Sequence, residues 1–192
     1  MHGDHWDDDG PLPLGVVIEG GRGSLPFALL HGEALVACAA WAMGEAGVQL
    51  LDLGTPWAAV VESGAPLVWH DALCPMTPPE FITACVAQAL AEDAVVVGVL
   101  PVTDTVKEIV EGPDGPVVGR TLDRDGLVAI ASPIVIPPSV VAVLADWPST
   151  DLPSAVRSLR RAGPVRLVEG PPTARRVASE DDVRALEALT AR

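Results

Sequence analysis

Apolar residues along the chain fall into two patterns, short unbroken runs and runs with helical spacing. Unbroken runs are typical of buried parallel strands, whereas apolar residues three and four positions apart indicate helices. The unbroken runs predict strands at 14–19, 48–53, 58–62, 65–71, 94–102, 127–132 and 165–170. Helical spacing predicts helices at 33–46, from Thr77–Pro78 onward, from about 138, at roughly 153–162 and after Ser179. This alternation predicts an α/β fold with a mostly parallel sheet.

Two of the predicted helices carry capping signals. Thr77 with Glu80 three positions later is typical of a capping box, and Pro78 suits the first helical position. Ser179 with Asp182 predicts the cap of the last helix. His31 is expected only to begin the first helix.

A hairpin arm is predicted between two of the sheet strands. Residues 107–122 consist of two strand-like stretches around a Pro-Asp-Gly turn, a pattern that indicates a β-hairpin. We expect the whole arm to span residues 101–126.

Candidate ligand-binding residues follow two of the predicted strands. In α/β sheets, ligands bind beyond the carboxyl ends of the strands. The first strand leads directly into a glycine-rich loop, and a later strand ends on His70 and Asp71. We therefore expect the loop and Asp71 to open onto the same edge of the sheet.

The glycine-rich loop consists of Gly20, Gly21, Arg22, Gly23 and Ser24. Backbone N–H groups in such a loop can surround phosphate oxygens, helped by the positive end of a following helix. The next ten residues, LPFALLHGEA, contain no lysine or arginine. The glycines suit a tight strand-to-helix turn equally well, so both interpretations stay open.

Composition narrows the classes of partner. The 192 residues carry 26 acidic and 12 basic side chains, a net charge of −14, and Lys107 is the one lysine. This balance argues against nucleic acid and anionic membranes as partners. Residues 127–145 are uncharged, but three prolines interrupt them, so we do not expect a membrane span. We expect an acidic tail at 1–12 and one domain at 13–192.

The cysteines and the N-terminal stretch indicate a cytoplasmic protein. Cys38, Cys74 and Cys85 form no C-x-x-C pair, and an odd number suggests reduced thiols. The start, MHGDHWDDDG, has no apolar segment and does not resemble a signal peptide. His2 and His5 among its aspartates could chelate a metal, although acidic termini are usually solvated tails.

Four stretches follow one another in a specific order: GGRGS at 20–24, HDALCPMTPPE at 70–80, LPVTDTVKEI at 100–109 and TLDRDGLVAIASP at 121–133. Together they resemble the 2-C-methyl-D-erythritol 4-phosphate cytidylyltransferase family of the non-mevalonate isoprenoid pathway. The family pattern there is AAGRGS, HDAARP, PVTDTIK and a DR-x-x-L strand. A weaker match covers 167–189, with a VEG turn before the final helix.

The resemblance implies a Rossmann-like nucleotidyltransferase fold, a homodimer through the hairpin arm, and Mg²⁺ beside the phosphates of CTP. Asp71 would bind the methylerythritol phosphate or lie in the metal region. Thr105 and Arg124 would hold the phosphate of this substrate, with Arg124 reaching in from the partner subunit. Thr150 and Asp151 would line the substrate, and Arg176, which aligns with the family's lysine before the last helix, would also bind it.

The sequence departs from the family pattern on the CTP side. The family's loop continues to an arginine and then a Pro-Lys-Gln-Tyr sequence, but here no arginine follows Ser24, and Phe27 stands in the lysine position. Cys74 replaces the HDAARP arginine, Arg176 replaces the lysine before the last helix, and nothing in 47–66 matches the family's base-binding unit.

These departures predict weak or absent activity. Loss of one preorganised electrostatic donor typically costs about 10²- to 10³-fold in rate. We therefore expect a divergent homologue whose cytidylyl transfer is weak or lost. The alternative is a non-catalytic dimeric binding or regulatory protein that keeps the fold.

Each retained residue also has a purely structural explanation. Asp71 could cap a turn, His70 could be a core histidine bonded to backbone, and Thr105 could lie at the pivot of the hairpin. Arg124 could pair with a neighbouring aspartate at the base of the arm. Cys74 follows a strand, but no histidine or carboxylate spacing makes it a convincing nucleophile.

Overall fold

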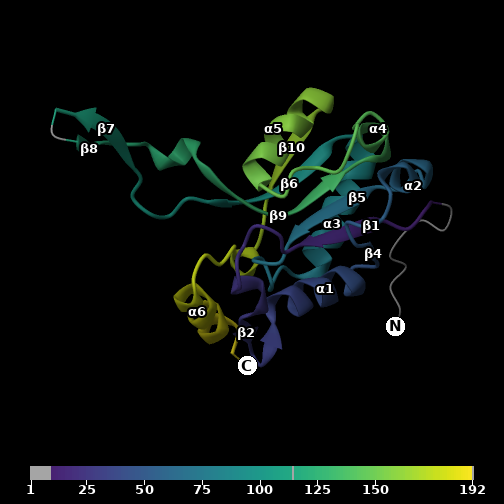
Figure 1. The fold of residues 1–192 in the computed structure, drawn as a ribbon, viewed down its shortest axis with the longest axis horizontal. Coiled ribbons are helices and arrows are strands. Elements are labelled where there is room, and N and C mark those ends of the chain that lie inside the picture. The colour runs from purple at the N-terminus through teal and green to yellow at the C-terminus, as the bar shows by residue number, and fades with distance from the viewer. Residues whose placement is uncertain (1–9, 114, 192) are drawn as a thin grey trace.

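A six-stranded sheet forms the centre of the computed structural model, which describes residues 10–113 and 115–191 (Figure 1). Its strands are β1 (Leu14–Ile18), β4 (Gln49–Leu50), β5 (Leu67–Asp71), β6 (Val95–Pro101), β9 (Val128–Ile136) and β10 (Val165–Glu169). The strand order is β10-β6-β9-β5-β1-β4. Strand β9 is antiparallel to β5 and β6, and the other three pairs are parallel. The predicted mostly parallel sheet is confirmed.

Helices cover both faces of the sheet. They are α1 (Leu35–Glu45), α2 (Trp57–Glu62), α3 (Pro79–Glu92), α4 (Pro138–Val141) and α5 (Leu152–Ala162). Helix α6 (Glu180–Thr190) belongs to a separate apolar cluster with Leu30 and Leu73. Helices α2, α4 and α5 pack on one face, and α1 and α3 pack on the other. Val95 and Val97 of β6 face the first group, whereas Val96 faces the second. Side chains of a strand alternate between its faces, so an unbroken apolar run suits a sheet buried on both sides.

Two predicted strands are wrong in extent or type. Residues 57–62 form helix α2, not a strand at 58–62, and the predicted strand at 48–53 is reduced to Gln49–Leu50. Trp57 fixes α2 by donating from its indole Nε1 to the Leu144 carbonyl at 3.0 Å and by packing edge-on against Trp147. A five-residue apolar run has no period that separates strand from helix, so these tertiary contacts decide.

The glycine loop does not lead directly into a helix. A 3₁₀ turn, η1 (Leu25–Phe27), and a short hairpin of β2 (Leu29–Leu30) and β3 (Glu33–Ala34) come first. His31 and Gly32 form the tip of that hairpin with positive φ angles of 52° and 88°. The prediction that His31 begins the first helix is therefore wrong, and the N-terminus of α1 does not follow the loop.

The two capping predictions have opposite outcomes. The Thr77 hydroxyl donates to the Cys74 carbonyl at 2.9 Å, and Pro78 takes the N-cap position of α3 without a side-chain hydrogen bond, so that capping box is wrong. The Ser179 side chain accepts the Asp182 amide at the start of α6, as predicted.

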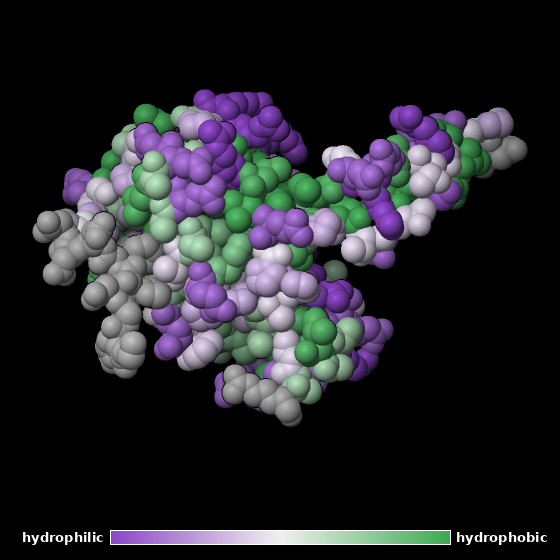
Figure 2. Space-filling view, turned by 180° about the vertical axis from the view of Figure 1, so that it is seen from behind, coloured by the Kyte–Doolittle hydropathy of each residue, from purple (hydrophilic) through white to green (hydrophobic). Residues whose placement is uncertain are grey.

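The hairpin arm projects from the body of the molecule (Figure 1). Strands β7 (Lys107–Gly112) and β8 (Gly115–Thr121) pair with each other in a separate two-stranded sheet, as the sequence predicts. Its apolar side chains lie open, with Ile109 64% and Val118 68% exposed. Hydrophobic surface runs along the arm in the space-filling view (Figure 2).

Two expectations concern segments that the structure describes only in part. The proposed tail of residues 1–12 and the metal-binding suggestion for His2 and His5 lie wholly or mostly outside the described residues. The division into tail and domain therefore stays a prediction. No helix in the described part of the chain is long and apolar enough to cross a membrane.

Candidate functional site

A polar pocket of about 540 Å³ opens at the carboxyl ends of β1 and β5. The loop after β1, the end of β5, the segment before α5 and the segment before α6 all contribute to its lining. The predicted site residues that line it are Gly20, Gly21, Arg22, Asp71, Thr150, Asp151 and Arg176. The pocket's apolar side consists of Val128, Ile130 and Leu152 with Pro153. The structure thus brings most of the predicted site to one place.

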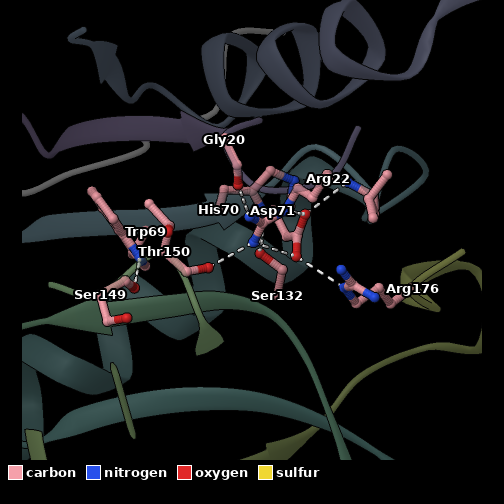
Figure 3. A network of polar contacts seen from close by, with 10 residues as sticks. Gly20, Arg22, Trp69, His70, Asp71, Ser132, Ser149, Thr150 and Arg176 are labelled. Carbon is pink, nitrogen blue, oxygen red and sulfur yellow. Dashed lines mark hydrogen bonds and ion pairs between the residues drawn. The ribbon is translucent and has the colours of Figure 1, made fainter. Parts of the chain in front are cut away.

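Asp71, the last residue of β5, lies at the centre of the pocket's polar network (Figure 3). Its Oδ1 accepts from Arg22 Nε at 2.7 Å and from the Leu73 amide at 2.9 Å. Its Oδ2 accepts from Arg22 Nη2 and from Arg176 Nε, both at 3.0 Å. A carboxylate has about four acceptor positions, so this one is fully used.

The charge of Asp71 is fixed by these partners. Burial alone would raise the pKa of its carboxyl group, but the hydrogen bonds from Arg22, the Leu73 amide and Arg176 outweigh burial and lower it. Asp71 is therefore ionised, and its suggested role as a simple turn cap accounts for only one of its four hydrogen bonds.

Arg22 joins three segments of the chain. Besides its two bonds to Asp71, its guanidinium donates to the Gly20 carbonyl and to the Thr150 carbonyl, the latter at 2.8 Å. Its side chain is only 7% exposed. It is also the only arginine or lysine that precedes Lys107 in the sequence. The single cation of the N-terminal half is thus committed to an internal ion pair.

The glycines of the loop serve its backbone conformation. Gly21 and Gly23 have positive φ angles of 78° and 60°, which side chains rarely tolerate. No heavy atom lies within 4 Å of where a Cβ would stand at either position. These φ angles account for glycine at both positions and suit a tight turn as well as a phosphate-binding loop.

Arg176, from the segment before α6, is the second arginine that contacts Asp71. Its side chain is 38% exposed and donates to Asp71 through Nε. Within the described residues, its two terminal nitrogens make no hydrogen bond, so they are available to a ligand in the pocket. Arg176 and Arg22 share one carboxylate but differ in how many of their guanidinium nitrogens already donate a hydrogen bond.

A buried histidine lies behind Asp71. Ser132 Oγ accepts the Asp71 amide at 2.9 Å and lies 2.6 Å from His70 Nδ1. Burial lowers the pKa of His70 to about 4, against the opposing effect of the Asp71 charge, so the imidazole is neutral near pH 7. Burial also raises the pKa of the Cys74 thiol above its ordinary value, which agrees with the expectation that Cys74 is not a convincing nucleophile.

An aromatic pair supports the segment that carries Thr150 and Asp151. Trp69 of β5 donates from Nε1 to the Ser149 carbonyl at 3.1 Å and stacks on Trp147 at a ring separation of 5.8 Å. Asp151 caps α5 by accepting the Ser154 amide at 3.0 Å. Trp69, Ser132 and Ser149 were not singled out from the sequence, and the only available signal was the position of Trp69 two residues before Asp71.

The remaining predicted site residues lie elsewhere. Arg124, in the 3₁₀ turn η2 (Arg124–Gly126) at the base of the arm, donates to the Thr103 carbonyl rather than to a neighbouring aspartate. Neither Arg124 nor Thr105 lines the pocket within this one chain. Gly23, Ser24 and Phe27 also lie outside its lining, and Phe27 is 60% exposed.

Comparison with known proteins decides the family. The model of the IspD family, 2-C-methyl-D-erythritol 4-phosphate cytidylyltransferase, matches residues 57–192, well over half of the chain. The chain belongs to this family. Asp71, Arg176 and the arm lie inside the matched region, and the glycine loop with Arg22 precedes it. IspD proteins are cytidylyltransferases of isoprenoid biosynthesis with a Rossmann-like fold.

Individual IspD relatives agree with this assignment. The 2-C-methyl-D-erythritol 4-phosphate cytidylyltransferase of Frankia casuarinae is 37% identical over 137 residues, which are 70% of this chain and 50% of that protein. The one from Nocardia farcinica is 37% identical over 134 residues, 69% of this chain and 56% of that protein. The chain spans about half the length of the curated relatives that it matches.

Solved IspD structures share the fold. The 2-C-methyl-D-erythritol 4-phosphate cytidylyltransferase from Thermus thermophilus superposes with a TM-score of 0.65 at 21% identity, covering 93% of this chain and 98% of that one. The 4-diphosphocytidyl-2C-methyl-D-erythritol synthase from Anaerococcus prevotii gives a TM-score of 0.66 at 15% identity, covering 96% and 98%. These likenesses confirm the Rossmann-like nucleotidyltransferase fold.

The donor set of this IspD homologue does not fit a metal bound directly by Asp71. Enzymes of the family are metal-dependent nucleotidyltransferases, and the sequence suggested Asp71 as the metal residue. Both of its carboxylate oxygens are occupied, and two guanidinium groups would repel a cation beside them. No group of three or more His, Cys, Asp or Glu residues in the described part of the chain could hold a metal ion.

Proposed function

We propose that the protein is a divergent IspD homologue that binds a small phosphorylated molecule in the Asp71 pocket and whose cytidylyl transfer is weak or absent. The observation that carries this proposal is the set of hydrogen bonds that Arg22 makes within the protein. Arg22 is the cation on the side of the pocket that the resemblance assigns to CTP. Its guanidinium already donates to four acceptors of the protein itself.

The loop side of the pocket supports the loss of transfer activity. Nucleotidyl transfer gathers negative charge on a phosphate in the transition state, and preorganised cations or N–H donors stabilise that charge. Phe27, in the position of the family's lysine, is an exposed apolar side chain in η1. No arginine or lysine lies between Arg22 and Lys107 to replace it.

The Arg176 side of the pocket supports ligand binding. A phosphate oxygen is a strong acceptor for the planar fork of a guanidinium group. Arg176 offers two terminal nitrogens to the pocket, whose volume suits a small molecule. Among phosphorylated compounds, methylerythritol phosphate is the first to test, because the curated relatives carry its name.

A homodimer through the arm belongs to the same proposal. An isolated two-stranded hairpin is marginally stable in water, and this one exposes Ile109 and Val118 by 64% and 68%. Burial against a second copy would cover these side chains and bring Thr105 and Arg124 toward the pocket of the partner. Light scattering at micromolar concentration should give twice the chain mass, and Val118→Asp should give the mass of one chain.

Product analysis by mass spectrometry tests the catalytic part of the proposal. The protein is incubated with CTP, methylerythritol phosphate and Mg²⁺, beside the Frankia casuarinae relative as a positive control. Diphosphocytidyl-methylerythritol and pyrophosphate should form readily with the control and near background with this protein. Turnover comparable to that of the control would overturn the proposal.

A further inference from the structure

We infer that Arg22 takes the place of a divalent cation at Asp71, so that the pocket binds a phosphate group on Arg176 without a metal ion. This inference rests on the proposed function, because it concerns the same pocket and its phosphorylated ligand. It goes further by assigning the source of positive charge and by excluding a metal requirement for binding.

The first argument is the saturation of the Asp71 carboxylate. A Mg²⁺ ion needs at least one free carboxylate lone pair at about 2.0–2.1 Å with near-octahedral geometry. The two oxygens of Asp71 together already accept four hydrogen bonds, and three of these four come from guanidinium nitrogens. A metal ion could bind only after Arg22 or Arg176 had left.

The second argument is the charge that the arginines provide. Arg22 and Arg176 together contribute two positive charges beside the single negative charge of Asp71, which leaves an excess of one inside the network. Asp151 adds a negative charge at the exposed rim, but its carboxylate faces the Ser154 amide at the start of α5. The four charged side chains of the lining thus sum to zero. A phosphate dianion that enters beside Arg176 meets its two unused guanidinium nitrogens in a balanced site, although the whole chain carries −14.

The third argument is rigidity. Arg22 is 7% exposed, and its guanidinium bonds reach Gly20, Asp71 and Thr150, which belong to three separate segments. A cation fixed in this way needs no recruitment from solution and stays in place when the ligand leaves. Arg176, with a 38% exposed side chain and unused terminal nitrogens, is then the group that meets the phosphate.

Calorimetric titration with inorganic phosphate tests this inference on the full chain. The titration is run once with EDTA and once with excess Mg²⁺, after correction for the binding of Mg²⁺ by phosphate itself. We expect the two affinities to agree within about twofold, because the site supplies its own positive charge. Binding that requires Mg²⁺ would overturn the inference and leave the proposed ligand pocket standing.

Two neighbouring arginines provide a matched pair of variants. Arg176→Gln should weaken phosphate binding by about ten- to a hundredfold, the effect of losing charge-assisted hydrogen bonds. Arg175→Gln is the control, since Arg175 lies outside the pocket lining and pairs with Asp182 at 4.0 Å. Equal losses in both variants would overturn the assignment of Arg176. No phosphate binding by the unmodified protein under either condition would overturn the inference and the proposed ligand binding together.

Manganese binding gives a second, independent readout. In Arg22→Gln, the Asp71 carboxylate regains free lone pairs, so Mn²⁺ should bind and broaden its electron paramagnetic resonance signal. The unmodified protein should leave the signal of free Mn²⁺ unchanged. Circular dichroism tests whether the variant is folded. If it is unfolded, the phosphate titrations with EDTA and with Mg²⁺ still test the inference. Binding of Mn²⁺ by the unmodified protein that Asp71→Asn abolishes would contradict the inference.

Discussion

Arg22 and Arg176 donate hydrogen bonds to the same carboxylate, that of Asp71, yet they are suited to different tasks. Arg22 is buried and also bonds to the carbonyls of Gly20 and Thr150. Arg176 is partly exposed and uses only Nε. The comparison teaches that an arginine beside a pocket is not by itself a binding or catalytic group. Its ability to bind a ligand depends on how many of its guanidinium N–H groups have no acceptor within the protein.

The largest effect is expected when the shared partner is removed. Asp71→Ala leaves Arg22 buried without its counter-charge, and breaking a buried pair in this way typically costs about 3–5 kcal/mol. Urea unfolding monitored by circular dichroism measures the loss. Asp151→Ala is the control, because it removes only the exposed cap of α5 and should lower stability much less. A loss no greater in Asp71→Ala would show that the network contributes little to stability.

A pH effect of slightly smaller size is expected from the histidine behind Asp71. Because burial lowers the pKa of His70 to about 4 in the folded protein, the unfolded chain binds a proton first as the pH falls. Stability should therefore be complete above about pH 6.5 and decrease by about 3 kcal/mol on the way to pH 4. The lowered pKa of Asp71 acts in the same direction at still lower pH.

His70→Asn isolates this contribution. The asparagine carbonyl can still accept from Ser132 Oγ, but it does not titrate. The loss of unfolding free energy between pH 7 and pH 4.5 should be smaller in the variant than in the unmodified protein. Equal losses would mean that His70 is not the group responsible.

The smallest effect is expected from a cation added on the loop side. Phe27→Lys restores the charge of the family pattern at an exposed position of η1. Under the proposed function, cytidylyl transfer should stay near background, because Phe27→Lys supplies neither the second cation nor the base-binding unit that the family pattern implies. One electrostatic donor typically changes a rate by about a hundredfold or more. A rise in turnover of that size would contradict the view that the internal ion pair of Arg22 leaves the loop side of the pocket unable to support transfer.

Much of the fold could be predicted because its signals are local. The unbroken apolar run of β6 and the cap at Ser179 each depend on residues close together in the sequence. The type of α2 could not be predicted, because Trp57 and Val60 are fixed by contacts with distant residues such as Trp147 and Leu144. Short apolar runs do not contain the information that chooses between strand and helix.

The sequence predicted that the glycine loop and Asp71 would lie close together, but not which hydrogen bonds join them. Parallel strands bring the glycine loop and Asp71 to one edge, so their proximity followed from the fold. The Arg22–Asp71 pair joins residues 49 positions apart, and no spacing rule reports which way a loop arginine turns. One signal was present in the sequence, since Arg22 is the only arginine or lysine before Lys107.

Thermal unfolding with and without phosphate tests most directly whether Arg22 stabilises the fold and Arg176 binds phosphate. Without phosphate, Arg22→Gln should lower the Tm by roughly 10 °C through the broken buried pair. Arg176→Gln should lower it by less than about 3 °C, because its side chain is partly exposed. Phosphate should raise the Tm of the unmodified protein and raise that of Arg176→Gln much less. A phosphate-induced rise of the same size in Arg176→Gln, or equal losses of Tm in both variants without phosphate, would contradict this account.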